Sequence, residues 1–380
     1  MGEELRAQLR DGFDVLVHCK GGLGRAGTVA AQLLIELGTR PAAAIEAVRA
    51  ARPRAIETTS QASYLLGLKV VAEPVPSHSL PAVRDRALGA SLGLAVGDAV
   101  GTTLEFKQRD SYPPLNGMVG GGPFGLQPGQ WTDDTAMALA LAASLLRHPE
   151  LSESDLMERF SLWQTRGDYS CIGKCFDVGF TVSKALQRYR ATGEPIAGST
   201  DPMSAGNGSL MRLAPVAVRF WNKPELLTSI AARQSLTTHG AAEAVSACVA
   251  YAQLLSEAIA GEARSVVMRR RNEALSGKVK AILGGSWRGM ARDKIRSSGY
   301  VADSLEAALW SVGRTGDFRS AVLTAANLGE DADTTTAIAG QLAGAIYGIS
   351  GIPAKWLDML AWQPIIRSMA ERLFDASISE

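Results

Sequence analysis

Aromatic residues, cysteines and net charge are all scarce in this chain of 380 residues. Aromatics make up 6% of the sequence and the formal net charge is +1. The composition therefore disfavours a β-sandwich and gives no electrostatic signature of nucleic-acid or membrane binding. The four cysteines, Cys19, Cys171, Cys175 and Cys248, follow no disulfide framework, which indicates a reducing compartment, here the cytoplasm. Cys171 and Cys175 have no partner pair, which disfavours a zinc site.

Alanine, glycine and aliphatic residues are abundant instead, and hydrophobic residues reach 46%. This length and composition predict roughly two domains that are mainly α, with closely packed helices. We expect helices at residues 83–100, 135–147, 177–190, 241–259 and 334–348. Residues 334–353 are the longest weakly charged stretch, but Gln341, four glycines and a preceding acidic cluster favour a buried helix over a membrane span. No signal peptide is evident.

A proline-rich linker divides the chain. Residues 73–81 contain three prolines, which keep the backbone extended and non-helical. We therefore expect an N-terminal segment at 1–72 and an all-helical main domain at 82–380. Within the last of the expected helices, Gly340, Gly344 and Gly348 recur every four residues, which would let a neighbouring helix approach closely.

The N-terminal segment contains a loop that resembles the phosphate-binding loop of tyrosine and dual-specificity phosphatases. A short strand is expected at Val15-Leu16-Val17 and a helix at residues 29–37. Between them lie Cys19, five further residues and Arg25, in the spacing of that loop. Glycines there would let backbone N–H groups face a phosphate at the helix N-terminus, and Arg25 could hold two phosphate oxygens.

The same glycines, Gly22, Gly24 and Gly27, also match a dinucleotide-binding pattern. That interpretation needs a second strand about twenty residues on, where residues 42–51 are helical in pattern. The phosphatase-like enzymes use an aspartic acid well upstream of the cysteine, and Asp11 and Asp14 lie too close to Cys19. We therefore expect the C-terminal part of a phosphatase-like domain, a small α/β fragment with weak or no activity.

Two acidic clusters are the most informative feature of the main domain. They are Thr132-Asp133-Asp134-Thr135 and Asp331-Ala332-Asp333-Thr334, and each precedes an apolar helical pattern. Burying so much negative charge is costly unless a cation neutralises it. Oxygen ligands without His or Cys favour a hard cation such as Mg²⁺ or Mn²⁺. Helix capping is the alternative, but it explains one acidic residue at a helix start, not two at both.

Several segments, in order, resemble the ADP-ribosylglycohydrolase family, particularly its bacterial branch typified by dinitrogenase reductase-activating glycohydrolase. The resemblance covers roughly three-quarters of the chain and rests on residues 93–106, 129–135, 175–179, 206–212, 238–239 and 327–335. It implies an all-helical fold and two metal ions, Mg²⁺ or Mn²⁺, that bind the ribose hydroxyls of ADP-ribose. The implied ligands are Thr132, Asp133, Asp134, Asp331, Asp333 and Thr334.

The resemblance also implies catalytic and ligand-binding residues. Asp177 is similar to the residue that assists ribose ring opening by proton transfer in arginine-specific enzymes, and a surface carboxylate is the alternative. Glu105 could act as a general acid or base, or be a solvated loop residue, and Asp134 joins the catalytic set as a metal ligand. The implied ADP-ribose contacts are Gly206, Asn207, Gly208, Ser209 and His239. Trp131, with Phe124, could cover adenine or ribose, or belong to the core.

The resemblance implies a metal-dependent hydrolase that removes ADP-ribose from arginine on proteins, with a modified protein as substrate and ADP-ribose as product. No nucleic acid or membrane partner is expected. The alternatives are a hydrolase of another linkage, to serine, nucleic acid or a small molecule, and a non-catalytic ADP-ribose-binding protein. A phosphoprotein phosphatase resting on Cys19 and Arg25 is disfavoured. Residue 330 is Glu where the resembled family commonly has Gly, which bears on metal affinity.

Overall fold

Helices provide nearly all of the regular structure in the computed structural model, which describes residues 2–21, 24–272 and 275–379. The chain divides into two units, residues 1–75 and 76–380. Among the described residues, β pairing is limited to the isolated bridges Gly121–Leu126, Ser199–His239 and Gly206–Tyr300. The chain is therefore mainly α, as its composition predicts.

The first unit contains the helices α1 (Gly2–Arg10), α2 (Gly24–Glu36), α3 (Pro41–Ala51) and α4 (Thr59–Leu66). Its small core is aliphatic and comprises Ala31, Ile35, Ala44, Ile45, Ile56 and Leu65. The strand expected at residues 15–17 is extended but pairs with no other described strand. That expectation was wrong because a strand needs a partner ladder, which this unit does not supply in its described part.

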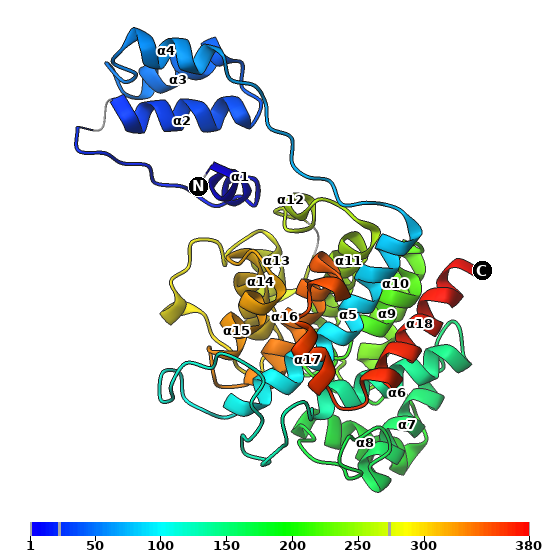
Figure 1. Ribbon diagram of the computed structural model, residues 1–380. Helices are drawn as coiled ribbons and strands as arrows, with labels where there is room; N and C mark the ends of the chain where they lie inside the picture. The colour runs from blue at the N-terminus through cyan, green and yellow to red at the C-terminus, as the bar shows by residue number, and fades with distance from the viewer. Residues whose placement is uncertain (1, 22–23, 273–274, 380) are drawn as a thin grey trace. The chain divides into compact units, whose positions relative to one another are not determined.

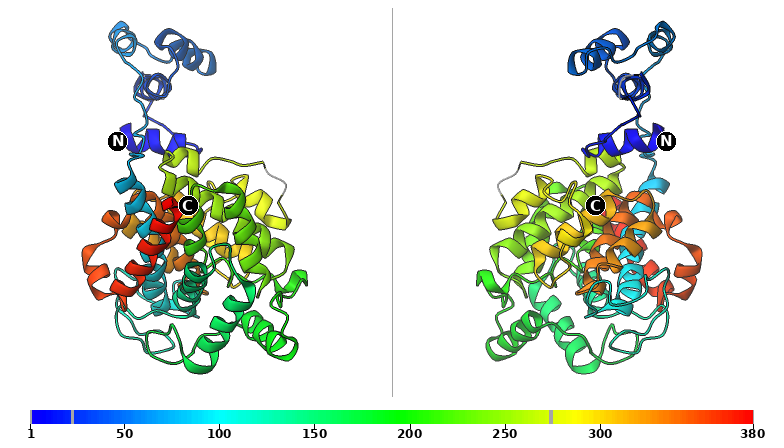
Figure 2. Two further views of the ribbon diagram at one scale, coloured as in Figure 1. Left: turned by 90° about the vertical axis from the view of Figure 1, so that its right-hand side faces the viewer. Right: turned by 90° about the vertical axis from the view of Figure 1, so that its left-hand side faces the viewer.

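The second unit is a bundle of helices joined by long loops. Its α-helices are α5 (Leu80–Gly101), α6 (Asp133–Arg147), α7 (Glu153–Arg166), α8 (Phe180–Thr192), α9 (Ala214–Phe220), α10 (Pro224–Leu236), α11 (Ala242–Ala260), α12 (Arg264–Val267), α13 (Gly277–Leu283), α14 (Val301–Gly313), α15 (Phe318–Ala326), α16 (Ala332–Tyr347), α17 (Ala354–Met359) and α18 (Gln363–Ser379). Its short 3₁₀ helices are η1 (Thr102–Leu104), η2 (Pro202–Ser204), η3 (Arg292–Lys294) and η4 (Ile349–Gly351). Figure 1 shows α5 and α16 side by side at the centre of this unit. Figure 2 gives two further views of this helical unit.

Glycines bring α5 and α16 into backbone contact. A Cβ on Gly89 would lie 2.2 Å from the Gly344 carbonyl oxygen, and one on Gly93 would lie 2.3 Å from that of Gly340. At the far end, a Cβ on Gly101 would lie 2.4 Å from the Ala332 oxygen. The pairs run in opposite directions, so the helices are antiparallel. The expectation from the glycine repeat is confirmed, and the C-terminal end of α5 lies beside the N-terminal end of α16.

The α5 helix is apolar enough to resemble a membrane span. Residues Leu80–Leu104 are long and apolar enough to cross a membrane, but 89% of their most apolar part is buried inside the protein. A helix at the centre of a bundle is buried on all sides and is therefore hydrophobic all round. Its composition is therefore explained by its place against α16.

Candidate active site and metal centre

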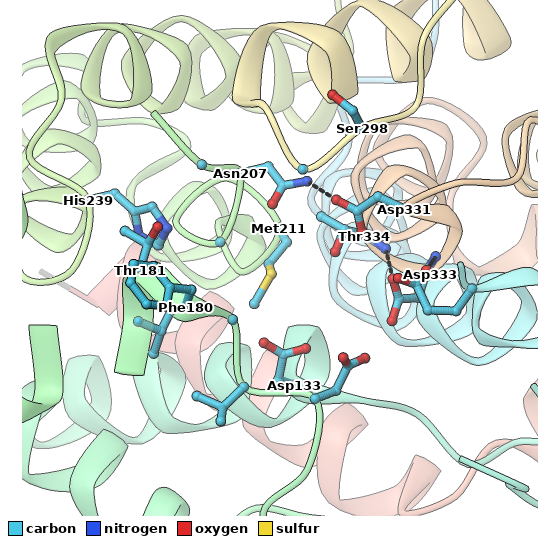
Figure 3. A pocket seen from close by; sticks show the side chains of 18 of the residues that line it. Asp133, Phe180, Thr181, Asn207, Met211, His239, Ser298, Asp331, Asp333 and Thr334 are labelled. Carbon is cyan, nitrogen blue, oxygen red and sulfur yellow. Dashed lines mark hydrogen bonds between the residues drawn. The ribbon is translucent and has the colours of Figure 1, made fainter. Parts of the chain in front are cut away.

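The loops at one end of the central helix pair enclose a pocket of about 550 Å³. Figure 3 shows Asp331, Asp333 and Thr334 on one side, His239 and Thr181 across from them, and Asp133 between. The residues predicted from the sequence that line it are Glu105, Asp133, Asp177, Gly206, Asn207, Gly208, His239, Asp331, Asp333 and Thr334. Folding thus brings together segments that lie between residues 105 and 334 of the sequence.

Asp98, near the C-terminal end of α5, organises the first acidic cluster. Its Oδ1 accepts hydrogen bonds from the backbone N–H and hydroxyl of Thr132, both at 2.9 Å. Its Oδ2 accepts from the N–H of Thr135 at 3.0 Å and from its hydroxyl at 2.6 Å. Asp98 is completely buried, and it fixes the start of α6 against α5.

The hydroxyl oxygen of Thr132 lies among three carboxylates. It is 2.9 Å from Asp98 Oδ1, 3.3 Å from Asp134 Oδ2 and 3.2 Å from Asp333 Oδ2. One hydroxyl proton can satisfy only one of these oxygens at a time. Asp134 Oδ1 is also buried without a hydrogen-bond partner. The cluster therefore has more buried acceptors than donors.

A second group of carboxylates adjoins the first. Carboxylate oxygens of Asp98, Asp134 and Asp333 lie within 4.8 Å of one another, and so do those of Glu105, Asp331 and Asp333. Asp333 belongs to both groups, so two neighbouring cation positions could share it. Asp133 belongs to neither group but lines the same pocket.

Backbone N–H groups and the Asn207 side chain hold the second group in place. Glu105 Oε2 accepts hydrogen bonds from the N–H groups of Ala332 and Asp333, at 2.7 and 3.2 Å, and so caps the N-terminus of α16. Asn207 Nδ2 donates to Asp331 Oδ2 at 2.7 Å. Glu105 is 3% exposed, so the alternative of a solvated loop residue does not describe its surroundings.

The backbone around Glu330 brings Glu105 to this position. Glu330 has a φ of +61°, a left-handed conformation that glycine adopts most easily. Its carbonyl accepts from the N–H of Phe106 and its N–H donates to the carbonyl of Lys107, both at 2.8 Å. These two bonds tie the loop after η1 to the loop before α16. Glu330 lines the pocket, and its conformation explains why glycine suits this position.

Burial and mutual repulsion disfavour the charged forms of these acids. Burial, followed by the neighbouring Asp333, raises the pKa of Asp98 to about 7, and burial with the same neighbour raises the pKa of Asp331 to about 7. Burial, with nearby acids, raises the pKa of Asp133 and Asp134 well above the usual range. A divalent cation would reverse these shifts, since it favours the carboxylate form. An all-oxygen set with an unpartnered buried oxygen fits Mg²⁺ or Mn²⁺.

Asp177 lies in the pocket but not on a helix. It precedes α8 by three residues and has a φ of +57°. The expectation of a helix from residue 177 was therefore wrong by three residues, because the left-handed backbone interrupts it. The turn places the carboxyl beside Asp333, and burial, with further acids nearby, raises the pKa of Asp177 to about 6. The alternative of a surface carboxylate on a helix is thereby disfavoured.

The glycine loop and His239 form the opposite wall. A Cβ on Gly208 would lie 2.9 Å from His239 Cε1, and one on Gly206 would lie 3.3 Å from His239 Nε2. Only glycines let the ring lie so close to this loop. His239 is 2% exposed, and burial together with Arg212 lowers its pKa to about 3. The imidazole is therefore neutral near pH 7.

Two predicted ligand contacts lie behind the pocket. Trp131 is completely buried, packs edge-on against Trp362 and donates its indole N–H to the Ala361 carbonyl at 3.0 Å. Its burial favours the core alternative over a contact with adenine or ribose. Ser209 is also fully buried, and its hydroxyl accepts from Ser235 at 2.8 Å. Phe180, which was not predicted, is 78% exposed and lines the pocket.

The phosphatase-like loop is described only in part. Gly22 and Leu23, in its middle, lie outside the described residues. Cys19 is half-buried and Arg25 is exposed, at the start of α2.

The comparisons with known proteins agree with this geometry. Residues 79–380 match the ADP-ribosylglycohydrolase family, and residues 3–65 match the phosphatase domain described as Swiss Army Knife protein, DSP-PTPase. The ADP-ribosylarginine hydrolase Tri1 of Serratia proteamaculans is 44% identical over 290 residues, which are 76% of this chain and 79% of that protein. The ADP-ribosyl-[dinitrogen reductase] glycohydrolase of Rhodospirillum rubrum is 36% identical over 74% of this chain and 92% of its own length.

A solved structure, described as an ADP-ribosylglycohydrolase-related protein complex, superposes with a TM-score of 0.70 at 40% identity. The alignment covers 78% of this chain and 99% of that chain. The helical second unit, with its acidic pocket, therefore has the fold of ADP-ribosylglycohydrolases. The chain belongs to the ADP-ribosylglycohydrolase family, and it is an enzyme of that family, preceded by a phosphatase-like segment.

Proposed function

We propose that the chain hydrolyses the N-glycosidic bond between ADP-ribose and arginine on a protein, and that it requires Mg²⁺ or Mn²⁺. The observation that carries the proposal is the gathering of Asp98, Thr132, Asp134 and Asp333 around shared oxygens in one buried site. The Tri1 relatives, at 44% and 45% identity, are named as ADP-ribosylarginine hydrolases, which favours the arginine linkage.

Some residues of the site would hold the cations and the substrate, and others would transfer protons. The two clusters of carboxylates would hold two cations, which would orient the ribose hydroxyls and polarise their oxygens. The glycine loop and His239 face the diphosphate with uncharged donors. Asp177 in its acid form donates a proton to the ribose ring oxygen as the ring opens. Water then adds at the ribose carbon that carries the guanidine, and the guanidine leaves with one proton of that water. The remaining proton returns to Asp177.

The test compares three linkages in parallel. Substrates that carry ADP-ribose on arginine, on serine and on a nucleic-acid end are incubated with the chain and Mg²⁺ or Mn²⁺, and free ADP-ribose is measured. Release from the arginine substrate should exceed release from the others at least tenfold. Asp134→Ala and Asp177→Asn should abolish it, whereas Asp168→Asn, an exposed residue of the loop before α8, should not. Preference for another linkage would transfer the proposal to that linkage, and binding without turnover would contradict hydrolysis.

We propose separately that the N-terminal unit has weak or no phosphatase activity. The extended residues 13–18 pair with no described strand, so the loop of Cys19 lacks the sheet that usually supports such a loop. Robust turnover of a phosphotyrosine peptide that disappears in Cys19→Ser would refute this.

A further inference from the structure

Arg212 is a fully buried cation without a carboxylate partner among the described residues. It is 0% exposed, and its Nε donates to Gln234 Oε1 at 3.0 Å. Its Nη2 donates to the Gln234 carbonyl at 3.0 Å and to Thr238 Oγ1 at 2.9 Å. The Phe160 ring lies 4.6 Å from the guanidinium carbon. Burial lowers the pKa of Arg212 to about 9, so it remains charged near pH 7. Asp133 attracts this charge and raises the pKa, but no hydrogen bond or ion pair joins a carboxylate to Arg212 among the described residues. A buried charge without a direct ionic partner is costly.

The hydrogen bonds from Arg212 continue to the pocket wall. Thr238 Oγ1, which accepts from Arg212, lies 2.8 Å from His239 Nδ1. The buried hydroxyl of Thr238 has one proton to donate, and Nδ1 of His239 is the acceptor that the described residues offer it. This direction leaves Nδ1 unprotonated, whereas the reverse direction would leave the buried Thr238 proton without an acceptor among the described residues. A neutral imidazole carries its single proton on the other nitrogen, Nε2.

Nε2 of His239 is directed at the glycine loop of the pocket. It lies 3.3 Å from the position of a Cβ on Gly206 and 3.1 Å from that of one on Gly208. His239 lines the pocket and is 2% exposed, and no described residue forms a hydrogen bond with its Nε2. The side chain is thus a buried donor with its proton free for a ligand.

We propose that Arg212 and Thr238 are positioning residues that fix His239 as its Nε2–H tautomer, so that it donates to the diphosphate of ADP-ribose. This inference rests on the proposed function for the identity of the ligand. The positive charge of Arg212 polarises the chain of hydrogen bonds and is itself balanced when the anionic ligand binds. The donor carries no charge, so it does not compete with the cations for the nearby carboxylates.

The experiment is a matched set of buried threonine variants. Thr238→Val removes the hydroxyl at constant shape, and Thr238→Ser retains it. Thr237→Val is the control, because the Thr237 hydroxyl is equally buried but donates to the Gln234 carbonyl at 2.7 Å and does not contact His239. Nitrogen-15 spectra of histidine-labelled protein report the tautomer directly, and the chain has only four histidines, so His239→Gln assigns the signal.

In the wild type, the His239 signals should show a neutral ring protonated at Nε2 from pH 5 to 8, without ligand. Thr238→Val should mix the tautomers, raise the dissociation constant of ADP-ribose with Mg²⁺ and the KM about tenfold, and leave kcat nearly unchanged. Thr238→Ser should restore most of the loss, and Thr237→Val should show none. Arg212→Lys, which keeps the charge but not the forked geometry, should behave like Thr238→Val if it folds.

A wild-type ring protonated at Nδ1, or a Thr238→Val protein with the tautomer and affinity of the wild type, would overturn the proposal. The tautomer is read without ligand, so it is decided separately from the proposed function. A wild type that binds no ADP-ribose would sink the proposed function and the ligand contact, while the spectrum would still decide whether Arg212 and Thr238 fix the ring.

Discussion

At the scale of single residues, Asp98 contributes more to the acidic site than its place inside an apolar helix suggests. It receives four hydrogen bonds, from the backbone and hydroxyl groups of Thr132 and Thr135. It also belongs with Asp134 and Asp333 to one group of carboxylates that could hold a cation. It is therefore both a structural anchor for α6 and a candidate ligand.

Asp98→Asn should separate these two roles. The amide keeps the shape but loses the charge, and its NH₂ group would face a threonine hydroxyl and N–H. We expect metal affinity to fall about 10- to 100-fold and kcat/KM to fall at least as much. Titration calorimetry with Mn²⁺ and initial rates provide the measurements. Asp85→Asn, on the same helix but bonded to Ser350, is the control. Unchanged Mn²⁺ affinity in Asp98→Asn would exclude Asp98 from the site.

His239 should give the protein a specific sensitivity to acid. Burial lowers its pKa from 6.5 to about 3, so between these values the unfolded chain binds a proton that the folded chain does not. The free energy of unfolding must then fall as the pH falls through this window, by up to about 1.4 kcal/mol per pH unit. From pH 6.5 to 5 the wild type should lose about 1.7 kcal/mol more than His239→Gln.

Urea unfolding at several pH values measures this difference, with His78→Gln at an exposed histidine as the control. Parallel stability curves for the wild type and His239→Gln would show that His239 is not buried in its neutral form.

The sequence was a good guide to which acidic residues lie in the site. It was a poorer guide to the hydrogen-bond partners, burial and backbone conformation of individual residues. The doubled acids at 132–135 and 331–334 were informative because helix caps do not need them. Asp98 was missed as a candidate ligand, since a single acid in an apolar run gives no sign of its partners. The burial of Trp131 could not be predicted because an aromatic next to a cluster can face either way. The helix start at Asp177 was three residues early because a positive φ leaves no mark in a non-glycine residue.

At the scale of elements, the contact between α5 and α16 positions the whole acidic site. Its glycines leave no room for a methyl group: a Cβ on Gly344 would lie 1.9 Å from the Gly89 oxygen. The spacing of four residues could be recognised in the sequence because it repeats with the turn of a helix. The partner helix could not, since α5 and α16 are separated by more than two hundred residues and several other glycines compete.

Gly344→Ala should therefore be strongly destabilising although alanine favours helices. Backbone atoms cannot yield as a flexible side chain can, so the helices must separate, at a cost of about 3 kcal/mol or more. Gly117→Ala is the control, because a Cβ there would have no atom within 4 Å. Chemical denaturation compares the two. Equal stability for both variants would mean that the helices can separate without cost, and the site would then not depend on their contact.

At the scale of the whole molecule, stability and metal binding should be linked. Buried carboxylates without a cation repel one another and lose hydration, so the metal-free chain carries a destabilising cluster. A ligand that binds only the folded state adds about 2.7 kcal/mol at one hundred times its dissociation constant. Mg²⁺ or Mn²⁺ should raise the melting temperature by several degrees, and a chelator should reverse this.

Asp134→Ala tests the cause of that linkage. Without metal, Asp134 must either stay protonated or be repelled by its neighbours, and both are costly because its pKa is raised well above the usual range. Removing the acid relieves this cost, so the variant should be more stable than the wild type in chelator but gain little from added metal. Scanning calorimetry of both proteins, in chelator and in Mn²⁺, measures whether the order of their melting temperatures reverses. A variant that is less stable than the wild type in chelator would show that the carboxylate is held by hydrogen bonds and not by a cation.

The division into two units allows a last test of which part of the chain does the chemistry. Every residue that lines the pocket lies between 105 and 334, and the family match begins at residue 79. The first unit, residues 1–75, has its own aliphatic core around Ala31, Ile45 and Leu65.

A chain that begins at Pro76 should keep its kcat/KM for the arginine-linked substrate within about twofold, because no atom of the pocket is removed. Cys19→Ser in the full chain should likewise leave hydrolysis unchanged. If truncation lowers activity and Cys19→Ser does not, the first unit contributes by recruiting the substrate. If both lower it equally, the chemistry of the cysteine loop is coupled to the hydrolase, and the two units must be studied as one enzyme.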